Sequence, residues 1–258
     1  MVYTIIDVII GRMNILKEST KYKLRQILYY VVLVSFLLPI VYLTVLIAIY
    51  NPETATRPRS DYSLMLVQCV LGVLVIHIPA LFIHRFQIDI PVVLHIMYIV
   101  FLYCAIFLGE IASFYYRVPH WDDILHAMSS VMTGFFAYML IAILNHGVRI
   151  RMALSPVFVA LFAFCFSVTI GTVWEIYEFT ADFALGLNMQ KFITSSGEVL
   201  VGQAALADTM MDLIIDSIGA LAASLIGLLS LHRKGWIHAY FGKSVRPVKD
   251  EPQLSKNL

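Results

Sequence analysis

Ten side chains that can bind protons or metal ions lie near the ends of four hydrophobic segments between residues 90 and 231. They are Glu110, Asp122, Asp123, His126, Glu175, Glu178, Asp182, Asp208, Asp212 and Asp216. Carboxylates together with one imidazole suit Mg²⁺, Mn²⁺ or Zn²⁺. The same groups can serve as general acids and bases. This set therefore predicts a divalent metal site or a site of proton chemistry.

The spacing of these residues arranges them in stripes if the segments are helical. Asp122 and His126 are four residues apart and share a helix face. Two sets of three acids cover arcs of about 60° and about 80°, at roughly 100° per residue. These sets are Glu175, Glu178 and Asp182, and Asp208, Asp212 and Asp216. A site built between facing helices requires such stripes.

The expected roles divide the ten residues into three groups. We expect the metal ligands to be His126, Glu175, Asp212 and Asp216. Either Glu178 or Asp123 is expected to act as general base on a water held by the metal. The residues expected to support the site or to cap helices are Asp122, Asp182, Asp208 and Glu110, since Asp is a favoured residue at helix starts.

An ionised carboxylate costs more free energy the deeper it lies in the membrane. Asp216 lies about 12 Å below Asp208 at about 1.5 Å per helical residue, and a carboxylate at that depth costs on the order of a few kcal/mol. Neighbouring carboxylates cannot all ionise without a compensating cation. The pocket is therefore expected to hold shared protons, a metal ion or a positively charged ligand.

Six segments are long and apolar enough to place these residues in a membrane. The chain has 258 residues, of which 60% are hydrophobic, and a span needs about 20 of them in a row. Five segments lack charged residues throughout, and the sixth carries three aspartates in its first half: 26–52, 62–84, 90–109, 124–148, 152–174 and 208–231. These segments predict an all-α, polytopic bundle of six transmembrane helices.

The basic residues predict the orientation of the bundle. Of 18 Lys and Arg residues, 14 would lie on the side of the two tails and four on the other. The positive-inside rule then places both termini in the cytoplasm and the acidic site at the outer face. The expected organisation is a cytoplasmic segment 1–25, a membrane domain 26–231 and a cytoplasmic basic tail 232–258. Segment 1–25 could be a surface helix or disordered, and the loop 183–207 could be a lid or dip into the membrane.

Local motifs add details to this picture. Small residues recur every four positions at Gly219, Ala223 and Gly227, and at Ser130 and Gly134, a spacing that lets membrane helices approach closely. Pro39 and Pro79 fall inside spans, where they are expected to kink the helices. The aromatic side chains expected at the membrane interface are Tyr115, Tyr116, Trp121 and Trp174.

Other function classes find little support in the sequence. The net charge of +1 gives no field that would attract nucleic acid. The sequence contains no Gly-x-Ser-x-Gly, His-Glu-x-x-His or Walker loop. The cysteines, Cys69, Cys104 and Cys165, lie inside hydrophobic segments and are expected to pack there as small apolar residues.

Three blocks resemble a known family. They are WDDILHAMSSVMTGFFAYML (121–140), GTVWEIYEF (171–179) and DTMMDLIIDSIGALAAS (208–224). They are similar to the YjdF-like family of bacterial inner-membrane proteins and, more loosely, to the VanZ-like family linked to glycopeptide resistance. Glu178 and Asp216 stand where the VanZ-like pattern tends to have Gln and Asn, which favours the YjdF-like family. That resemblance implies a bacterial plasma-membrane protein and names no reaction.

The sequence is consistent with three functions. The chain could be a metal-dependent enzyme, embedded in the membrane and acting on a lipid-like or envelope substrate. It could instead be a transporter coupled to protons or cations, because intramembrane carboxylates are typical of such proteins. The third reading is a scaffold or accessory protein whose polar cluster fixes helix packing.

Overall fold

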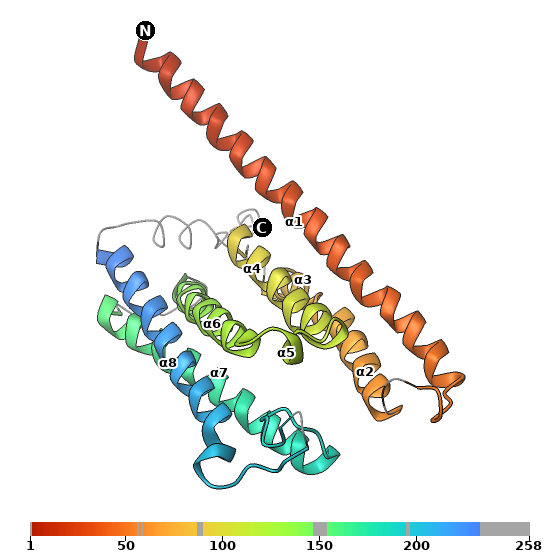
Figure 1. The fold of residues 1–258 in the computed structure, drawn as a ribbon. Coiled ribbons are helices and arrows are strands. Elements are labelled where there is room, and N and C mark those ends of the chain that lie inside the picture. The colour runs from red at the N-terminus through yellow and green to blue at the C-terminus, as the bar shows by residue number, and fades with distance from the viewer. Residues whose placement is uncertain are drawn as a thin grey trace, which may run out of the picture. The chain divides into compact units, whose positions relative to one another are not determined.

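The computed structural model describes residues 2–55, 57, 59–86, 90–146, 154–194 and 197–232, and these residues are almost entirely helical (Figure 1). Six helical segments are long and apolar enough to cross a membrane. They are Ser19–Ala48, Asp61–Arg85, Val92–Ile111, Trp121–Ile141, Pro156–Leu185 and Gln203–His232. The predicted all-α fold with six spanning helices is confirmed. The basic residues Arg149 and Arg151, and the predicted tail beyond His232, lie outside the described residues.

The helices extend further than the uncharged segments suggested. Helix α7 (Pro156–Leu185) passes through all three of its acids, and α8 (Gln203–His232) begins five residues before Asp208. The end of α7 is set by Gly186, whose φ of 65° is readily adopted by glycine and whose N–H bonds to the carbonyl of Asp182. The acids therefore lie within helices, because buried charged residues do not end a helix and a left-handed glycine does.

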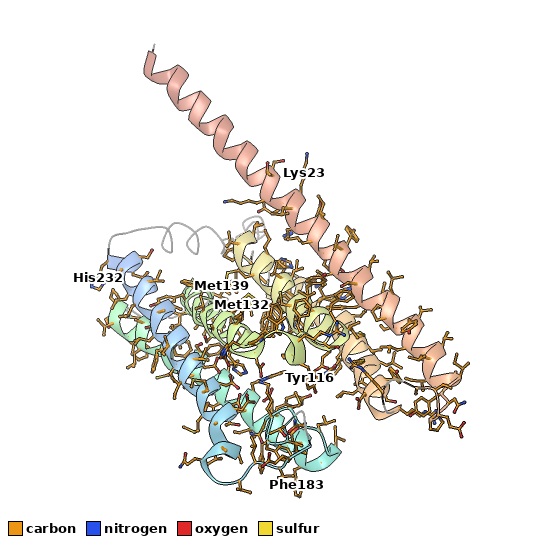
Figure 2. The ribbon with its side chains drawn as sticks, in the orientation of Figure 1. Lys23, Tyr116, Met132, Met139, Phe183 and His232 are labelled. Atoms are coloured by element: carbon orange, nitrogen blue, oxygen red, sulfur yellow. The ribbon has the colours of Figure 1, made fainter. Side chains whose placement is uncertain are left out.

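The first compact unit contains Met1–Leu81 and Val92–Leu125. Its helices are α1 (Val2–Ala48), α2 (Arg59–Val75), the first residues of α3 (Ile78–Phe86), α4 (Val92–Leu102), a π-helix (Tyr103–Ile111) and α5 (Phe114–Arg117). A core of Val32, Phe36, Ile76, Ile99 and Leu102 joins α1 to α2 and α4. The helical backbone of α1 begins at Val2, and Lys23 projects from it into open space (Figure 2).

The two prolines differ in their effect on the helices. Pro79 lies just after a break at Ile76 and His77, which separates α2 from α3. Proline removes a backbone donor and clashes with the preceding turn, which accounts for the break. Pro39 lies inside α1, which continues without interruption.

The second compact unit contains Phe82–Pro91 and His126–Leu258. It holds α7, α8 and all but the first turn of α6 (Trp121–His146). Helix α6 carries Met132 and Met139, and α7 carries Phe183 near its end (Figure 2). Ser155 caps α7 by accepting a hydrogen bond from the N–H of Phe158 at 3.2 Å.

Small residues bring the three helices of this unit close together. A side chain at Gly219 would collide with Ser130, one at Gly134 with Ala223, and one at Gly227 with Tyr138. The close helix approach predicted from these small residues is therefore confirmed. Hydroxyl groups add interhelical bonds, since Ser167 donates to the carbonyl of Ser130 at 2.7 Å and Ser224 to that of Ala160 at 2.7 Å.

Candidate metal centre

His126 lies at the centre of the polar cluster between α6, α7 and α8. Its side chain is only 5% exposed, and acids from both neighbouring helices surround its ring. The second nitrogen, Nε2, lies 3.7 Å from Glu175 Oε1 and 3.9 Å from Asp212 Oδ2. The first nitrogen, Nδ1, lies 3.2 Å from Asp216 Oδ2. The two sides of the ring therefore face different carboxylates.

The Nε2 side of His126 fits the dimensions of a metal site. Ligand atoms on opposite sides of one ion lie about 4.2 Å apart when each bond is about 2.1 Å long. The separations from Nε2 to Glu175 and Asp212 fall within that limit. Both carboxylates are buried, Asp212 to 99%. A divalent ion would thus be bound by nitrogen and oxygen ligands from three helices.

The Nδ1 side of His126 contacts an acid that is itself tightly held. Asp216 is 1% exposed and presses against Gly171 of α7, where any side chain would collide with its carboxylate. When Nδ1 carries a proton it donates to Asp216 Oδ2. Metal-binding histidines usually donate their other ring N–H to a carboxylate in this way. The geometry therefore favours Asp216 as the residue that orients His126.

Asp216 also has an unsatisfied acceptor. Within the described part of the chain, its buried Oδ1 accepts no hydrogen bond. A buried acceptor without a partner costs about 1–3 kcal/mol. This atom therefore indicates that the cluster accommodates a further proton or cation.

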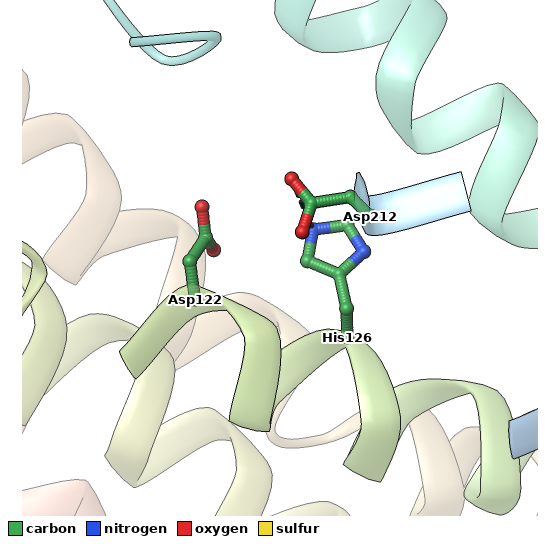
Figure 3. Close-up of side chains that lie close together, drawn as sticks. All are labelled: Asp122, His126 and Asp212. Carbon is green, nitrogen blue, oxygen red and sulfur yellow. Dashed lines mark ion pairs between the residues drawn. The ribbon is translucent and has the colours of Figure 1, made fainter. Parts of the chain in front are cut away.

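Asp122 lies on the first turn of α6, one turn before His126, so that the helix itself fixes their relative position. One ligand atom from each of Asp122, His126 and Asp212 lies within 4.8 Å of the others. Figure 3 shows Asp122 and His126 rising from α6 and the carboxylate of Asp212 facing the imidazole ring. Asp122 was expected to cap the helix, and this geometry makes it a candidate ligand as well.

Glu178 lies one turn beyond Glu175 on the buried face of α7. Its Oε1 accepts a hydrogen bond of 2.9 Å from the indole N–H of Trp174. Trp174 was expected to lie at the membrane interface. The i, i+4 spacing of the two residues was available in the sequence, and it is the signal that could have indicated this contact.

Asp182 anchors the loop after α7. Its two carboxylate oxygens accept hydrogen bonds from the backbone N–H groups of Met189 at 2.7 Å and Gln190 at 3.0 Å. The side chain of Gln190 then donates to Thr209 of α8 at 2.8 Å. Asp182 therefore ties the loop to the ends of α7 and α8. Its supporting role in the site stays a prediction.

Asp208 has a basic partner that is not apparent from the sequence. Lys191, in the loop between α7 and α8, lies with its ammonium 2.9 Å from Asp208 Oδ1. Both side chains are partly exposed, so the pair is screened by solvent and contributes little to stability. Nothing in the spacing of these residues along the chain predicts the contact, because it depends on the path of the loop.

The remaining two candidates have partners of their own in the first unit. Asp123 pairs with His120 at 2.7 Å, near the start of α6, and is partly exposed. Glu110, in the π-helix, accepts a hydrogen bond of 3.1 Å from Gln68 of α2. The structure therefore groups His126, Glu175, Asp212 and Asp216 with Asp122, and gives Asp123 and Glu110 other neighbours.

Six apolar spans and a buried cluster of acids around one histidine define a multi-pass membrane protein with a candidate metal site. Residues 32–233 match the family described as "Predicted membrane protein (DUF2238)", and the chain belongs to that family. It is also 33% identical over 113 residues to an uncharacterized protein of the bacterium Thermotoga maritima. That match covers 43% of this chain and 50% of the relative, so the aligned region is half of the relative's length. No solved structure gives a significant match.

Proposed function

We propose that the protein is a membrane-embedded enzyme that depends on a divalent metal ion and acts on a lipid-like or envelope substrate. The observation that carries this proposal is the environment of His126. Its Nε2 lies close enough to oxygens of Glu175 and Asp212 for the three atoms to share one ion, while its Nδ1 faces Asp216. This arrangement matches the histidine–carboxylate pairs of known metal sites.

The proposal gives each residue a defined task. His126, Glu175, Asp212 and Asp122 would hold the ion, and Asp216 would orient the imidazole. A bound Mg²⁺, Mn²⁺ or Zn²⁺ would supply Lewis acidity. Glu178 would accept a proton, and the indole of Trp174 would keep its carboxylate in place. Asp123 is the weaker candidate for that base because it is partly exposed and bonded to His120.

A lipid-like substrate is consistent with the surroundings of the cluster. The helices that carry it are spans, and apolar side chains such as Ile176, Phe179 and Ile214 lie exposed beside the buried acids. A substrate with an apolar chain could approach through the membrane. The proposal also includes cytoplasmic termini, a bacterial plasma membrane location, and membership of the YjdF-like group within the wider family.

The direct test is the thermal midpoint of the purified protein with EDTA, Mg²⁺, Mn²⁺ or Zn²⁺. An ion that binds the folded state raises the apparent stability by about 2.7 kcal/mol at a concentration of roughly 100 Kd. We expect one ion to raise the midpoint of thermal unfolding of the wild type. The midpoint of Asp212→Asn should stay the same when that ion is added. Elemental analysis of the purified protein would give the bound metal and its stoichiometry.

Asp123→Asn is the matched control, since it removes an acid from the same helix that lies outside the cluster. It should keep the response to metal. If no ion shifts the wild type, or if Asp212→Asn responds like the wild type, the metal site is refuted. The enzyme part of the proposal then requires that the same ion stimulate turnover of a lipid or envelope extract, and that Glu178→Gln abolish turnover while keeping metal binding.

Transport is a second candidate because hydroxyl groups continue along the helices below the acids. Ser130, Ser167 and Ser224 are buried, and Thr133 is partly buried. Each donates to a backbone carbonyl, as in the bonds of Ser130 to Ala127 and of Ser224 to Ala160. The bonds donated by Ser167 and Ser224 join two helices, so they explain helix packing without a proton path. Proton uptake into vesicles that is lost in Ser167→Ala would favour transport over the enzyme.

A further inference from the structure

The first unit contains an apolar groove along α1. Seven residues of α1 line it, mostly at spacings of three and four, which places them along one side of the helix: Val31, Val34, Ser35, Leu38, Pro39, Tyr42 and Leu43. This side is about 18 Å long at about 1.5 Å per residue. Tyr62 and Met65 of α2 and Phe107 of the π-helix close the other side. The cavity volume is about 550 Å³, within the range of ligand pockets, about 300–1,000 Å³.

The groove is open towards the surroundings of the helix. Leu38 is 66% exposed and Tyr42 is 65% exposed, although both lie in a membrane span. Such side chains face lipid when the protein is in its membrane. The material available to fill the groove is therefore hydrocarbon.

One basic side chain lies at the end of the groove where α1 finishes. Arg57 lines it next to Tyr62, Met65 and Leu43. Its guanidinium donates to Ser113 at 2.5 Å and contacts the sulfur of Met65 at 3.9 Å. These contacts hold the group in place, and a guanidinium has more N–H donors than they use.

One acid of this unit that interacts with Arg57 also has another partner. Glu110 interacts electrostatically with Arg57, but its Oε1 accepts a hydrogen bond from Gln68. Ser113 therefore positions the guanidinium of Arg57, and the carboxylate of Glu110 offsets part of its positive charge. It can still bind a phosphate oxygen through a charge-assisted bond.

We propose that this groove binds an anionic glycerophospholipid, with one acyl chain along α1 and the phosphate on Arg57. The inference is separate from the metal centre and uses none of its residues. An apolar channel of this length suits an acyl chain, and the positive charge at one end favours an anionic headgroup over a zwitterionic one. Basic side chains at the membrane surface favour anionic lipid by about fivefold each.

The test is native mass spectrometry of the full chain in detergent, with phosphatidylglycerol or phosphatidylcholine of identical acyl chains. We expect phosphatidylglycerol to be retained at one molecule per chain, about fivefold more than phosphatidylcholine. Arg57→Gln should reduce retention of phosphatidylglycerol to the level of phosphatidylcholine. Arg59→Gln, two residues along and exposed, is the matched control and should retain it like the wild type.

Two further variants separate lipid binding from a structural role of Arg57. Ser113→Ala removes the bond that positions the guanidinium and keeps its charge, so it should retain most of the preference. Leu38→Trp fills the groove and should lower retention of both lipids, and it tests the proposal even if Arg57→Gln does not fold. Equal retention of the two lipids by the wild type, or unchanged retention in Leu38→Trp, would overturn the proposal.

Discussion

The carboxylate of Asp216 contacts His126 on one side and fills the space in front of Gly171 on the other. Its Oδ2 lies 3.2 Å from His126 Nδ1, and a Cβ at position 171 would collide with it. Asp216 is therefore held between α6 and α7 although it belongs to α8. Its position, and through it the direction of the imidazole, depends on the absence of a side chain at residue 171.

Gly171→Ala is expected to weaken metal binding by displacing Asp216. Loss of a residue that orients a metal ligand typically lowers affinity by about 10–100-fold, and the thermal response to the ion should shrink accordingly. Gly134→Ala is the control, because its new Cβ would meet Ala223 of α8 and none of the acids. This variant should lower the free energy of unfolding by about 1–3 kcal/mol. Its midpoint of thermal unfolding should still rise when the metal ion is added, as in the wild type. Equal responses in both variants would contradict this role of Asp216.

Metal binding is expected to release protons and to weaken as the pH falls. Ligand atoms must be deprotonated to bind an ion, so protons compete with it. The crowded acids around His126 make shared protons the alternative to a cation. Calorimetric titration in two buffers of different ionisation enthalpy would give the number of protons released. A value of zero would mean that the cluster is already ionised before the metal enters.

Asp182→Ala is expected to release the loop from the end of α7. The variant removes the acceptor of two backbone N–H groups, each bond to a charged group being worth about 1.5–3 kcal/mol. Hydrogen exchange of the Met189 and Gln190 amides should accelerate strongly. Asp208→Asn, which alters the partly exposed pair with Lys191, should change stability by only about 0–1 kcal/mol. Unchanged exchange in Asp182→Ala would show that other contacts hold the loop.

Trp174→Phe is expected to destabilise the protein through Glu178. The change keeps an aromatic ring and removes the N–H that donates to Oε1, which costs about 1–3 kcal/mol when the acceptor is buried. Combining it with Glu178→Gln in a double-mutant cycle isolates the pair, for which we expect a coupling of about 0.5–3 kcal/mol. Strictly additive effects would show that Trp174 serves only the membrane interface.

The sequence predicted the spans well because long apolar segments are a strong signal. The acids of α7 lie within a helix, as their spacing indicated, although the uncharged segment stops at residue 174 and the helix ends only at the turn of Gly186. Charge marks where a segment becomes unsuited to lipid. It does not mark the end of a helix whose charged face is covered by neighbouring helices.

The grouping of His126 with acids of α7 and α8 follows the helical stripes that the sequence indicated. The roles assigned to these residues stay predictions. The partners of Asp123 and Glu110, namely His120 and Gln68, could not be predicted because they depend on how separate segments pack. The close contact of Gly171 with Asp216 has the same origin.

That contact also limits how these two positions can evolve. Aspartate is already the shortest side chain that carries a carboxylate, so no smaller acid at 216 could make room for a larger residue at 171. A lineage that keeps the aspartate at 216 must keep the glycine at 171. A lineage that loses the aspartate can replace the glycine with a larger residue. Chains descended from a common ancestor should therefore inherit Gly171 and Asp216 together or lose them together.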